Sequence, residues 1–233
     1  MFSLHSDNSG KAYRYERKFY LPDIGFSEVE AYVRLNPGLF HEIYHSRWVN
    51  NIYFDTPDHE CFKDNVEGSL FRTKERIRWY GELFGLIEKP MLEFKLKRGL
   101  VGRKESFKLH SFVLDESFNL EAIAEFIDGS DIPEPVRLRL RNAFPTLVNR
   151  YQRKYFLSAD SRFRITLDSG MEYYQVGPNN NVFLHPVIND RDIILELKYD
   201  VSSDDAASEI TGGFPFRVTK SSKYVQGVEA TVF

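Results

Sequence analysis

The segment from Leu70 to Tyr80 reads Leu-Phe-Arg-Thr-Lys-Glu-Arg-Ile-Arg-Trp-Tyr, in which charged and apolar residues alternate. Successive side chains of a β-strand point to opposite faces, so residues two apart share one face. One face of this segment therefore carries Arg72, Lys74, Arg76 and Arg78. The opposite face carries Phe71, Ile77 and Trp79. The alternation predicts a strand with one strongly basic face and one mainly apolar face.

The same alternation recurs in four other segments. In each, a charged face alternates with an apolar face, and the charged faces together hold both signs. The charged positions are Arg14, Glu16 and Lys18 in Tyr13–Leu21; Glu93, Lys95 and Lys97 in Met91–Arg98; Arg162, Arg164 and Asp168 in Arg162–Asp168; and Glu196 and Lys198 in Ile193–Asp200. The repetition predicts a sheet that has one charged side and one apolar side.

Two arrangements explain such a sheet. In the first, the charged side faces water while the apolar side covers a core, as in many antiparallel sheets. In the second, the sheet closes with its charged side inward and forms a tunnel. Like charges on neighbouring strands repel one another unless something anionic lies between them. This repulsion favours the tunnel, with helices covering the apolar outer side.

Further segments supply the remaining elements. The other predicted strands are Trp48–Asp55, Gly102–Leu109, Arg150–Ser158 and Glu172–Val176. The predicted helices are Ser27–Leu35 with Ser27 as N-cap, Asn119–Ile127, Glu134–Phe144 and Ser203–Thr211. A turn is predicted at Asp168-Ser169-Gly170. Because no repeat or linker divides the chain, we expect one domain over residues 1–233. Its expected fold is mainly β (α+β), a closed antiparallel β-barrel of about eight strands with peripheral helices.

Composition excludes several classes of protein. The 20 Phe and 13 Tyr among 233 residues, with a net charge of −3, exclude a disordered chain. No apolar run reaches the roughly 18 residues of a membrane span. A single cysteine, Cys61, forms no internal disulfide and predicts a cytoplasmic protein. The pI near 6.1 argues against nucleic acid as a partner. Residues 72–108 nevertheless hold 11 bases against 5 acids, which predicts a confined site for a compact anion.

Eight short motifs follow one another in an order found in one protein family. They are Tyr15-Glu16-Arg17-Lys18, Ile52-Tyr53-Phe54-Asp55-Thr56, Arg76-Ile77-Arg78-Trp79-Tyr80-Gly81, Leu92-Glu93-Phe94-Lys95, Asn149-Arg150-Tyr151-Gln152-Arg153, Arg164-Ile165-Thr166-Leu167-Asp168, Leu195-Glu196-Leu197-Lys198 and Ser221-Ser222-Lys223-Tyr224-Val225-Gln226-Gly227. The set resembles the VTC domain, the polyphosphate polymerase branch of the triphosphate tunnel metalloenzymes in the CYTH-like superfamily. The resemblance runs from about Tyr13 to Gly227.

The resemblance implies a fold, ligands and roles for particular side chains. The fold is an antiparallel barrel tunnel. The ligands are ATP or another nucleoside triphosphate, polyphosphate or inorganic triphosphate, and Mn²⁺ or Mg²⁺. The implied catalytic residues are Lys223, Arg76, Arg78 and Lys95. The implied substrate-binding residues are Lys18, Arg153, Arg164, Lys198, Glu16 and Glu93. Glu196 would ligate the metal, and Lys223 would be the basic group nearest the reacting phosphate.

These residue types suit that chemistry. Arginine offers planar, bidentate donors to phosphate oxygens and keeps its charge when buried, whereas lysine supplies a point charge. Mg²⁺ and Mn²⁺ need oxygen ligands, typically one or two carboxylates together with phosphates and water. Tyr53, Tyr151 and Tyr155 are expected to pack rather than to stack on a base.

Three functions remain open. The first is a polyphosphate polymerase-like phosphotransferase, which moves the γ-phosphate of ATP to a growing polyphosphate chain. The second is an inorganic or nucleoside triphosphatase that uses the same tunnel. The third is a non-catalytic module that binds polyphosphate or nucleotide. Hydrolase branches of the superfamily typically begin with Glu-x-Glu-x-Lys, but here the first acid is replaced by Arg14, which lowers the weight of the second function.

Other nucleotide and metal sites are not expected. The chain has no Gly-x₄-Gly-Lys-Ser/Thr loop, so bound ATP would not be held by a P-loop. His41 and His45 lie four residues apart but lack a third ligand nearby in sequence, so zinc is not expected.

Overall fold

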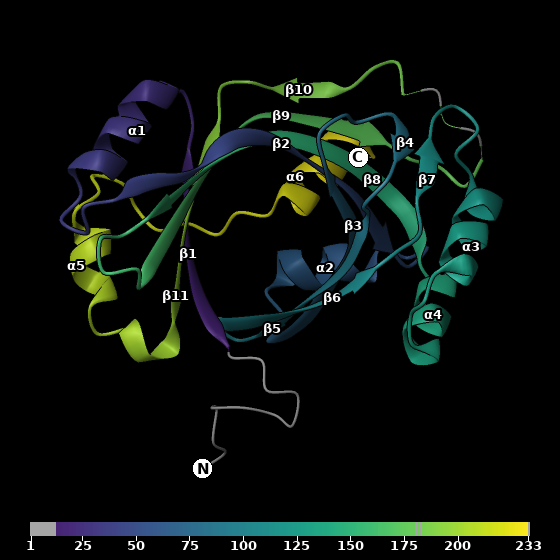
Figure 1. The fold of residues 1–233 in the computed structure, drawn as a ribbon, viewed down its shortest axis with the longest axis horizontal. Helices are drawn as coiled ribbons and strands as arrows, with labels where there is room; N and C mark the ends of the chain where they lie inside the picture. The colour runs from purple at the N-terminus through teal and green to yellow at the C-terminus, as the bar shows by residue number, and fades with distance from the viewer. Residues whose placement is uncertain (1–12, 180, 182, 233) are drawn as a thin grey trace, which may run out of the picture.

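A ring of eight strands forms the centre of the computed structural model, which describes residues 13–179, 181 and 183–232. Its order is β9 (Phe163–Gln175), β11 (Ile193–Asp200), β1 (Arg14–Leu21), β6 (Val101–Lys108), β5 (Met91–Arg98), β3 (Phe71–Tyr80), β2 (His41–Asp55) and β8 (Phe144–Leu157). Every neighbouring pair is antiparallel, and β8 closes the ring by pairing with both β2 and β9. Figure 1 looks into this ring. The predicted closed barrel is confirmed.

Smaller elements surround the ring. They are β4 (Gly85–Ile87), β7 (Phe112–Leu114), β10 (Val187–Asn189), α1 (Phe26–Leu35), α2 (Glu60–Glu67), α3 (Leu120–Gly129), α4 (Glu134–Arg141), α5 (Ala207–Gly212), α6 (Lys223–Thr231) and the 3₁₀ turn Val201–Ser203. The strand β10 pairs with β9 outside the ring, whereas β4 and β7 form a separate two-stranded sheet. No helix in the described part of the chain is long and apolar enough to cross a membrane.

Several local predictions were wrong for identifiable reasons. The segment predicted as two strands joined by a turn at 168–170 is the single strand β9, in which the pairing with β8 shifts register near Ser169. Gly170 has φ of +57°, a conformation that glycine adopts easily, so the strand bulges there instead of turning. The first helix begins at Phe26 after Gly25 and has no side-chain cap, so Ser27 is not its N-cap. The helix α4 ends at Arg141, and β8 begins at Phe144.

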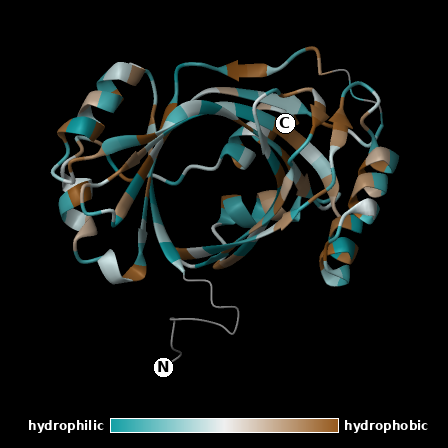
Figure 2. Cartoon of the chain, viewed as in Figure 1, coloured by the Kyte–Doolittle hydropathy of each residue, from teal (hydrophilic) through white to brown (hydrophobic). Residues whose placement is uncertain are grey.

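The apolar outer side of the barrel is covered by helices, as expected. One cluster joins outward residues of β3 and β5, such as Ile77 and Phe94, to Phe126 of α3 and Leu140 of α4. Figure 2 shows hydrophobic positions along α3, α4 and the nearby β4 and β7. A second cluster places α1 and α5 against the outer faces of β1, β9 and β11. The barrel is therefore held from outside by two apolar layers, which leaves its inner side free for polar groups.

The inner side has an apolar part as well, because α6 packs inside the ring. A third buried cluster contains Val49, Tyr53, Leu147, Tyr151, Met171, Tyr173, Ile194, Tyr224 and Val228. Tyr224 and Val228 belong to α6, and Figure 1 shows this helix within the outline of the ring. The buried carboxylate of Asp55, at the end of β2, accepts a hydrogen bond from the Tyr224 hydroxyl. These contacts fix the helix, which the sequence pattern did not predict.

Gly227 is the point at which α6 approaches the barrel wall most closely. A Cβ atom there would lie 2.3 Å from Leu147 Cδ2 and 2.6 Å from Tyr173 Cδ1. We expect Gly227→Ala to lower the free energy of unfolding by about 1–3 kcal/mol, because a packed interior must shift to admit the methyl group. Urea unfolding followed by circular dichroism measures this loss. Gly212→Ala is the matched control, because a Cβ atom at Gly212 meets nothing within 4 Å.

Candidate functional site

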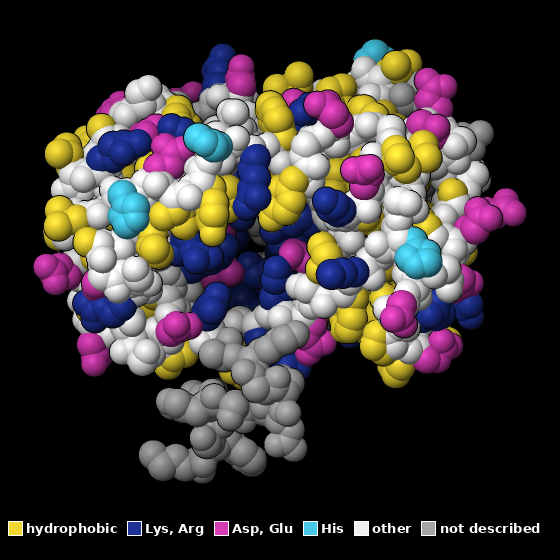
Figure 3. Space-filling model, in the orientation of Figure 1, with side chains coloured by type: hydrophobic (Ala, Val, Ile, Leu, Met, Phe, Trp, Pro, Cys, Tyr) yellow, Lys and Arg dark blue, Asp and Glu magenta, His cyan; other side chains and the backbone are white. Residues whose placement is uncertain are grey.

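One face of the molecule is hollowed at its centre, and basic side chains gather around the hollow (Figure 3). Strand alternation places charged side chains on the inner side of the ring, as the sequence predicts. Those that contact one another are Glu16 and Lys18 of β1, Arg76 and Arg78 of β3, Glu93 and Lys95 of β5, Arg153 of β8, Asp168 of β9, Glu196 and Lys198 of β11, and Lys223 of α6. All of them, Asp168 included, belong to the motifs that carry the resemblance.

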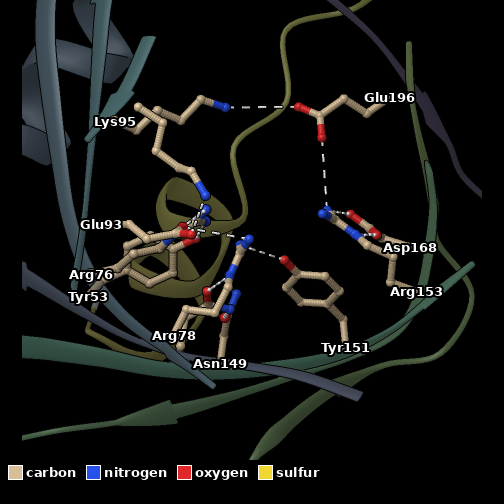
Figure 4. Close-up of polar contacts among 12 residues, drawn as sticks. Tyr53, Arg76, Arg78, Glu93, Lys95, Asn149, Tyr151, Arg153, Asp168 and Glu196 are labelled. Carbon is tan, nitrogen blue, oxygen red and sulfur yellow. Dashed lines mark hydrogen bonds and ion pairs between the residues drawn. The ribbon is translucent and has the colours of Figure 1, made fainter. Parts of the chain in front are cut away.

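The first group is built around Glu93. Its carboxylate lies 2.6 Å from Arg76 Nη2, 2.6 Å from Lys104 Nζ and 3.6 Å from Arg78 Nη1. Burial alone would raise the pKa of Glu93, but Arg76, Arg78 and Lys104 outweigh it and hold the pKa far below its usual value. Figure 4 shows the contacts of Glu93 with Arg76 and Arg78. Glu93 is therefore held as an anion that orients two guanidinium groups of β3.

Arg78 is also held by two uncharged side chains. Its Nε donates to Asn51 Oδ1 at 2.9 Å, and its Nη2 donates to the Tyr151 hydroxyl at 3.1 Å. Burial would raise the pKa of Tyr151, but the charges of Arg153 and Arg78 lower it to about 8. Tyr151 thus joins the polar site as well as packing against α6. The strand alternation already places Tyr151 on the inner face, because Tyr151 and Arg153 are two residues apart on one strand.

The second group surrounds Glu196. Its carboxylate lies 3.0 Å from Lys198 Nζ, 3.7 Å from Lys18 Nζ and 3.9 Å from both Lys95 Nζ and Arg153 Nη2. Burial opposes the charged form, yet these cations keep the pKa of Glu196 well below its usual value. Side chains from three strands other than β11 therefore converge on this carboxylate.

The third group joins the barrel wall to α6. Arg153 binds Asp168 through two hydrogen bonds of 2.5 and 2.7 Å, and Lys223 Nζ contacts the same carboxylate at 2.5 Å. Burial would raise the pKa of Asp168, but Arg153 and Lys223 lower it to about 2. Lys223 is the first residue of α6, and Ser222 caps the helix by accepting from Val225 N at 3.3 Å. The Ser-Ser-Lys stretch thus brings a lysine into the barrel.

Lys74 is a further basic residue that the resemblance did not include. Its Nζ donates to Ser222 Oγ at 2.6 Å, while Lys18 Nζ donates to the Ser221 carbonyl at 2.9 Å. Burial and then the nearby charges of Lys18 and Lys95 lower the pKa of Lys74 well below its usual value. The sequence pattern predicts this inward position of Lys74, because Lys74 shares its strand face with Arg76. Lys104 joins the site because it pairs across the sheet with Lys95, a register that the sequence pattern does not give.

Arg164 lies apart from these groups. It is on the same face of β9 as Thr166 and Asp168, but it is exposed at the end of the strand. Among the residues that the structure describes, no ion pair joins Arg164 to the carboxylates above. The sequence pattern identifies its face correctly, whereas its depth in the barrel depends on where the strand ends.

A divalent cation would find oxygen ligands at Glu196. Glu16 lies close enough to Glu196 to be affected by its charge. Burial and then the Glu196 charge raise the pKa of Glu16, but Lys95, Lys198 and Lys18 outweigh both effects and lower the pKa overall. Within the described ranges no group of three or more His, Cys, Asp or Glu side chains could hold a metal by itself. One or two carboxylates completed by phosphate oxygens and water is the arrangement that Mg²⁺ prefers. The residues therefore fit a metal that binds together with a phosphate ligand.

Comparison with known proteins agrees with this architecture. The family model of the VTC domain matches residues 13–232. No curated protein matches the chain. A solved structure from Hippeastrum, a candidate adenylyl cyclase described as having a dominant triphosphatase activity, is 14% identical, with 95% of this chain and 97% of that chain covered and a TM-score of 0.51.

Two further solved structures are similar. One is a candidate adenylate cyclase from Bacillus halodurans, with 15% identity, 93% and 97% coverage and a TM-score of 0.52. The other is a candidate adenylate cyclase from Vibrio parahaemolyticus, with 12% identity, 91% and 97% coverage and a TM-score of 0.50. Identities this low show a shared fold alone.

Proposed function

Because this chain belongs to the VTC domain family, we propose that it is a metal-dependent phosphotransferase that moves the γ-phosphate of ATP to the end of a polyphosphate chain. One observation carries the proposal: basic side chains from separate strands and from α6 converge inside one barrel, where they outnumber the carboxylates. Such a surplus of enclosed cations is costly unless an anion enters. A chain of phosphates is an anion that can contact several of these groups at once.

The arginines and lysines would have different roles in binding the substrate phosphates. Arg76, Arg78 and Arg153 are held by carboxylates on neighbouring strands, so their planar donors are oriented before a phosphate arrives. Lys95 and Lys223 reach the same space from β5 and from α6. Phosphoryl transfer depends mainly on positioning and on stabilising the charge of the transferred group. Substrate phosphates would replace some of the carboxylate contacts that orient these side chains.

Glu196, with Glu16 beside it, would hold Mn²⁺ or Mg²⁺. When bound, the cation neutralises phosphate charge and aligns the reacting groups. The same Glu196 carboxylate contacts Lys18, Lys95, Arg153 and Lys198 in the present structure. The chain's own residues would thus supply both the carboxylate for the metal and the cations for the phosphates.

The proposed reaction needs no base. A terminal phosphate oxygen of the polyphosphate chain attacks the γ-phosphorus of ATP. A new P–O–P bond forms, the bond from the γ-phosphorus to the β–γ bridging oxygen breaks, and ADP leaves with that oxygen. The attacking oxygen is already anionic, so the demand on the protein is to overcome repulsion between two anions. The basic groups of the barrel meet that demand.

The direct test is incubation of the protein with ATP and Mn²⁺, with and without a short polyphosphate primer. We expect ADP together with a phosphate polymer longer than the primer. Release of orthophosphate without chain growth would instead identify a triphosphatase, the activity described for the similar Hippeastrum protein. Tight binding without turnover would identify a binding module. One observation weighs against hydrolysis: Arg14, at the position of the first acid, pairs with Asp200 on the exposed surface at 3.2 Å.

The charge of Lys18 makes anion binding depend on pH. Burial lowers the pKa of Lys18 from 10.5 to about 8, although Glu196 opposes this effect. We expect the affinity for tripolyphosphate, measured by calorimetry in metal-free buffer with EDTA, to fall as the pH rises through about 8. The free energy of unfolding should instead rise with pH between about 8 and 10.5. Over this range the unfolded chain binds more protons at Lys18 than the folded protein does. Lys18→Arg should remove the contribution of this residue to both trends. Unchanged trends in Lys18→Arg would contradict the assignment.

A further inference from the structure

An arginine of β2 extends the basic inner surface toward the rim of the barrel. Arg47 pairs across the sheet with Arg153 of β8, and residues directly opposite each other on neighbouring strands place their side chains on the same face. Arg47 therefore belongs to the inner face. Its side chain is exposed, whereas Arg153 is only 6% exposed. The inner basic surface thus continues from the enclosed groups to the rim, where Figure 3 shows basic side chains around the hollow.

Three tyrosine rings hold the guanidinium of Arg47. Its Cζ lies over the rings of three side chains, at 4.2 Å from the centroid of Tyr80, 4.8 Å from that of Tyr155 and 5.6 Å from that of Tyr44. Its Nε also donates to the Tyr155 hydroxyl at 3.2 Å. We call these four residues the rim cluster. An exposed arginine normally has many rotamers, so these cation–π contacts orient the group before any ligand arrives.

Most of the donors of Arg47 are unused. Its Nη1 and Nη2 have no hydrogen-bond partner among the described residues, and no carboxylate there forms an ion pair with this side chain. Arg76 and Arg153, by contrast, are each paired with a carboxylate. An oriented guanidinium without a counterion is suited to an anion, and it can hold a phosphate with two N–H donors.

The rim cluster is in contact with the enclosed site. The Cζ of Arg153 lies 6.0 Å from the centroid of the same Tyr155 ring that Arg47 contacts. Arg153 in turn binds Asp168, which also contacts Lys223. A phosphate chain held by Arg153 and Lys223 would therefore reach Arg47 by passing one tyrosine ring.

A second arginine without a counterion lies on the other side of Tyr155. Tyr155 pairs with Thr166 of β9, and Arg164 shares the inner face of that strand two residues nearer its start. Arg164 pairs across the sheet with Lys198 of β11, whose amino group contacts Glu196. The side chain of Arg164 is exposed and forms no ion pair within the part of the chain that the structure describes. Exposed arginines thus flank Tyr155 on both neighbouring strands.

We propose that Arg47 and Arg164 form a rim subsite for the phosphates of a polyphosphate chain that extend beyond the enclosed basic groups. The assignment rests on the proposed function, because it presumes that the reacting end of such a chain lies inside the barrel. The enclosed groups would bind the last few phosphates, and the rim subsite would bind those that follow. The protein would therefore hold a long chain more tightly than a short one. A nucleobase fits Arg47 less well, since three rings already lie against its guanidinium and leave mainly the N–H donors.

Ligands of different length test the rim subsite. The Kd values of long-chain polyphosphate, tripolyphosphate and ATP are measured by calorimetry in metal-free buffer with EDTA. In Arg47→Gln and in Arg164→Gln we expect the Kd for the long chain to rise about tenfold, the usual effect of losing one charge-assisted contact. The Kd values for tripolyphosphate and ATP should change less than about twofold. Arg141→Gln is the matched control and should alter none of them, because this exposed arginine of α4 pairs with Asp128 outside the ring.

The possible results separate the rim subsite from the proposed function. An unchanged Kd for the long chain in Arg47→Gln, or an equal loss for tripolyphosphate, would overturn the assignment. A loss confined to ATP would place a nucleoside at the rim and would overturn it as well. If the unmodified protein binds none of the three ligands, the proposed function itself fails. Should Arg47→Gln melt far below the unmodified protein, Arg164→Gln decides by the same criteria, because its side chain is exposed.

Discussion

Glu196→Gln is expected to lower the rate of metal-dependent phosphoryl transfer by about 10³-fold, because a metal ion contributes several kcal/mol of charge stabilisation. The amide keeps the volume of the side chain but carries no charge to hold a cation. The measurement is ADP formation over a range of Mn²⁺ concentrations, together with the Mn²⁺ affinity in the presence of tripolyphosphate.

The binding of phosphates should respond differently in this variant. Removing the Glu196 charge leaves Lys18, Lys95 and Lys198 without this counterion, so tripolyphosphate should bind in EDTA at least as tightly as before. Glu105→Gln is the matched control, because Glu105 pairs with Arg103 on its own strand instead of joining the inner groups. A Glu196→Gln protein with unchanged turnover and Mn²⁺ dependence would place the metal elsewhere.

The second large effect is expected at Lys223. Lys223→Met should reduce kcat by about 10²–10³-fold, the usual loss when one oriented donor to a developing charge is removed. Asp168 would keep its two hydrogen bonds from Arg153, so the barrel wall at this point should stay intact. Methionine also retains most of the apolar stem that lies against Tyr151, whose ring centroid is 4.5 Å from Lys223 Nζ.

Single-turnover kinetics with saturating ATP and Mn²⁺ measure the change in kcat apart from binding. Lys89→Met is the control, because Lys89 is an exposed lysine in the loop before β5. Thermal unfolding of Lys223→Met should differ little from that of the unmodified protein. A normal rate accompanied by a large loss of thermal stability would show that Lys223 only anchors α6.

The fold and most of the candidate site were predictable because strand alternation is a local property. Residues two apart on a strand share a face whatever the rest of the chain does, so Arg76 and Arg78, or Glu196 and Lys198, could be grouped from the sequence alone. The same argument reaches Lys74 and Tyr151, which the strand pattern groups with these residues although the resemblance gave neither a role in the site.

The sequence could not predict α6 or the rim cluster. The segment after Ser222 has weak periodicity, and its position is decided by distant partners: Asp55 for Tyr224, Asp168 for Lys223, and the space that Gly227 leaves beside Leu147. Likewise, nothing local shows that rings from three strands will meet around Arg47 of β2.

From the amino-acid sequence one could read which side chains share a face and the sign of their charge, whereas the closed barrel was favoured by charge repulsion and implied by the family resemblance. The tertiary structure alone decided which of those charges meet. Closing the ring brings Lys18, Arg153 and Glu196 together from strands far apart in the chain, and α6 adds Lys223 to them. The physical reason is that a strand's alternation depends on backbone geometry within a few residues, whereas depth in the barrel and contacts across it depend on register, bulges and strand ends.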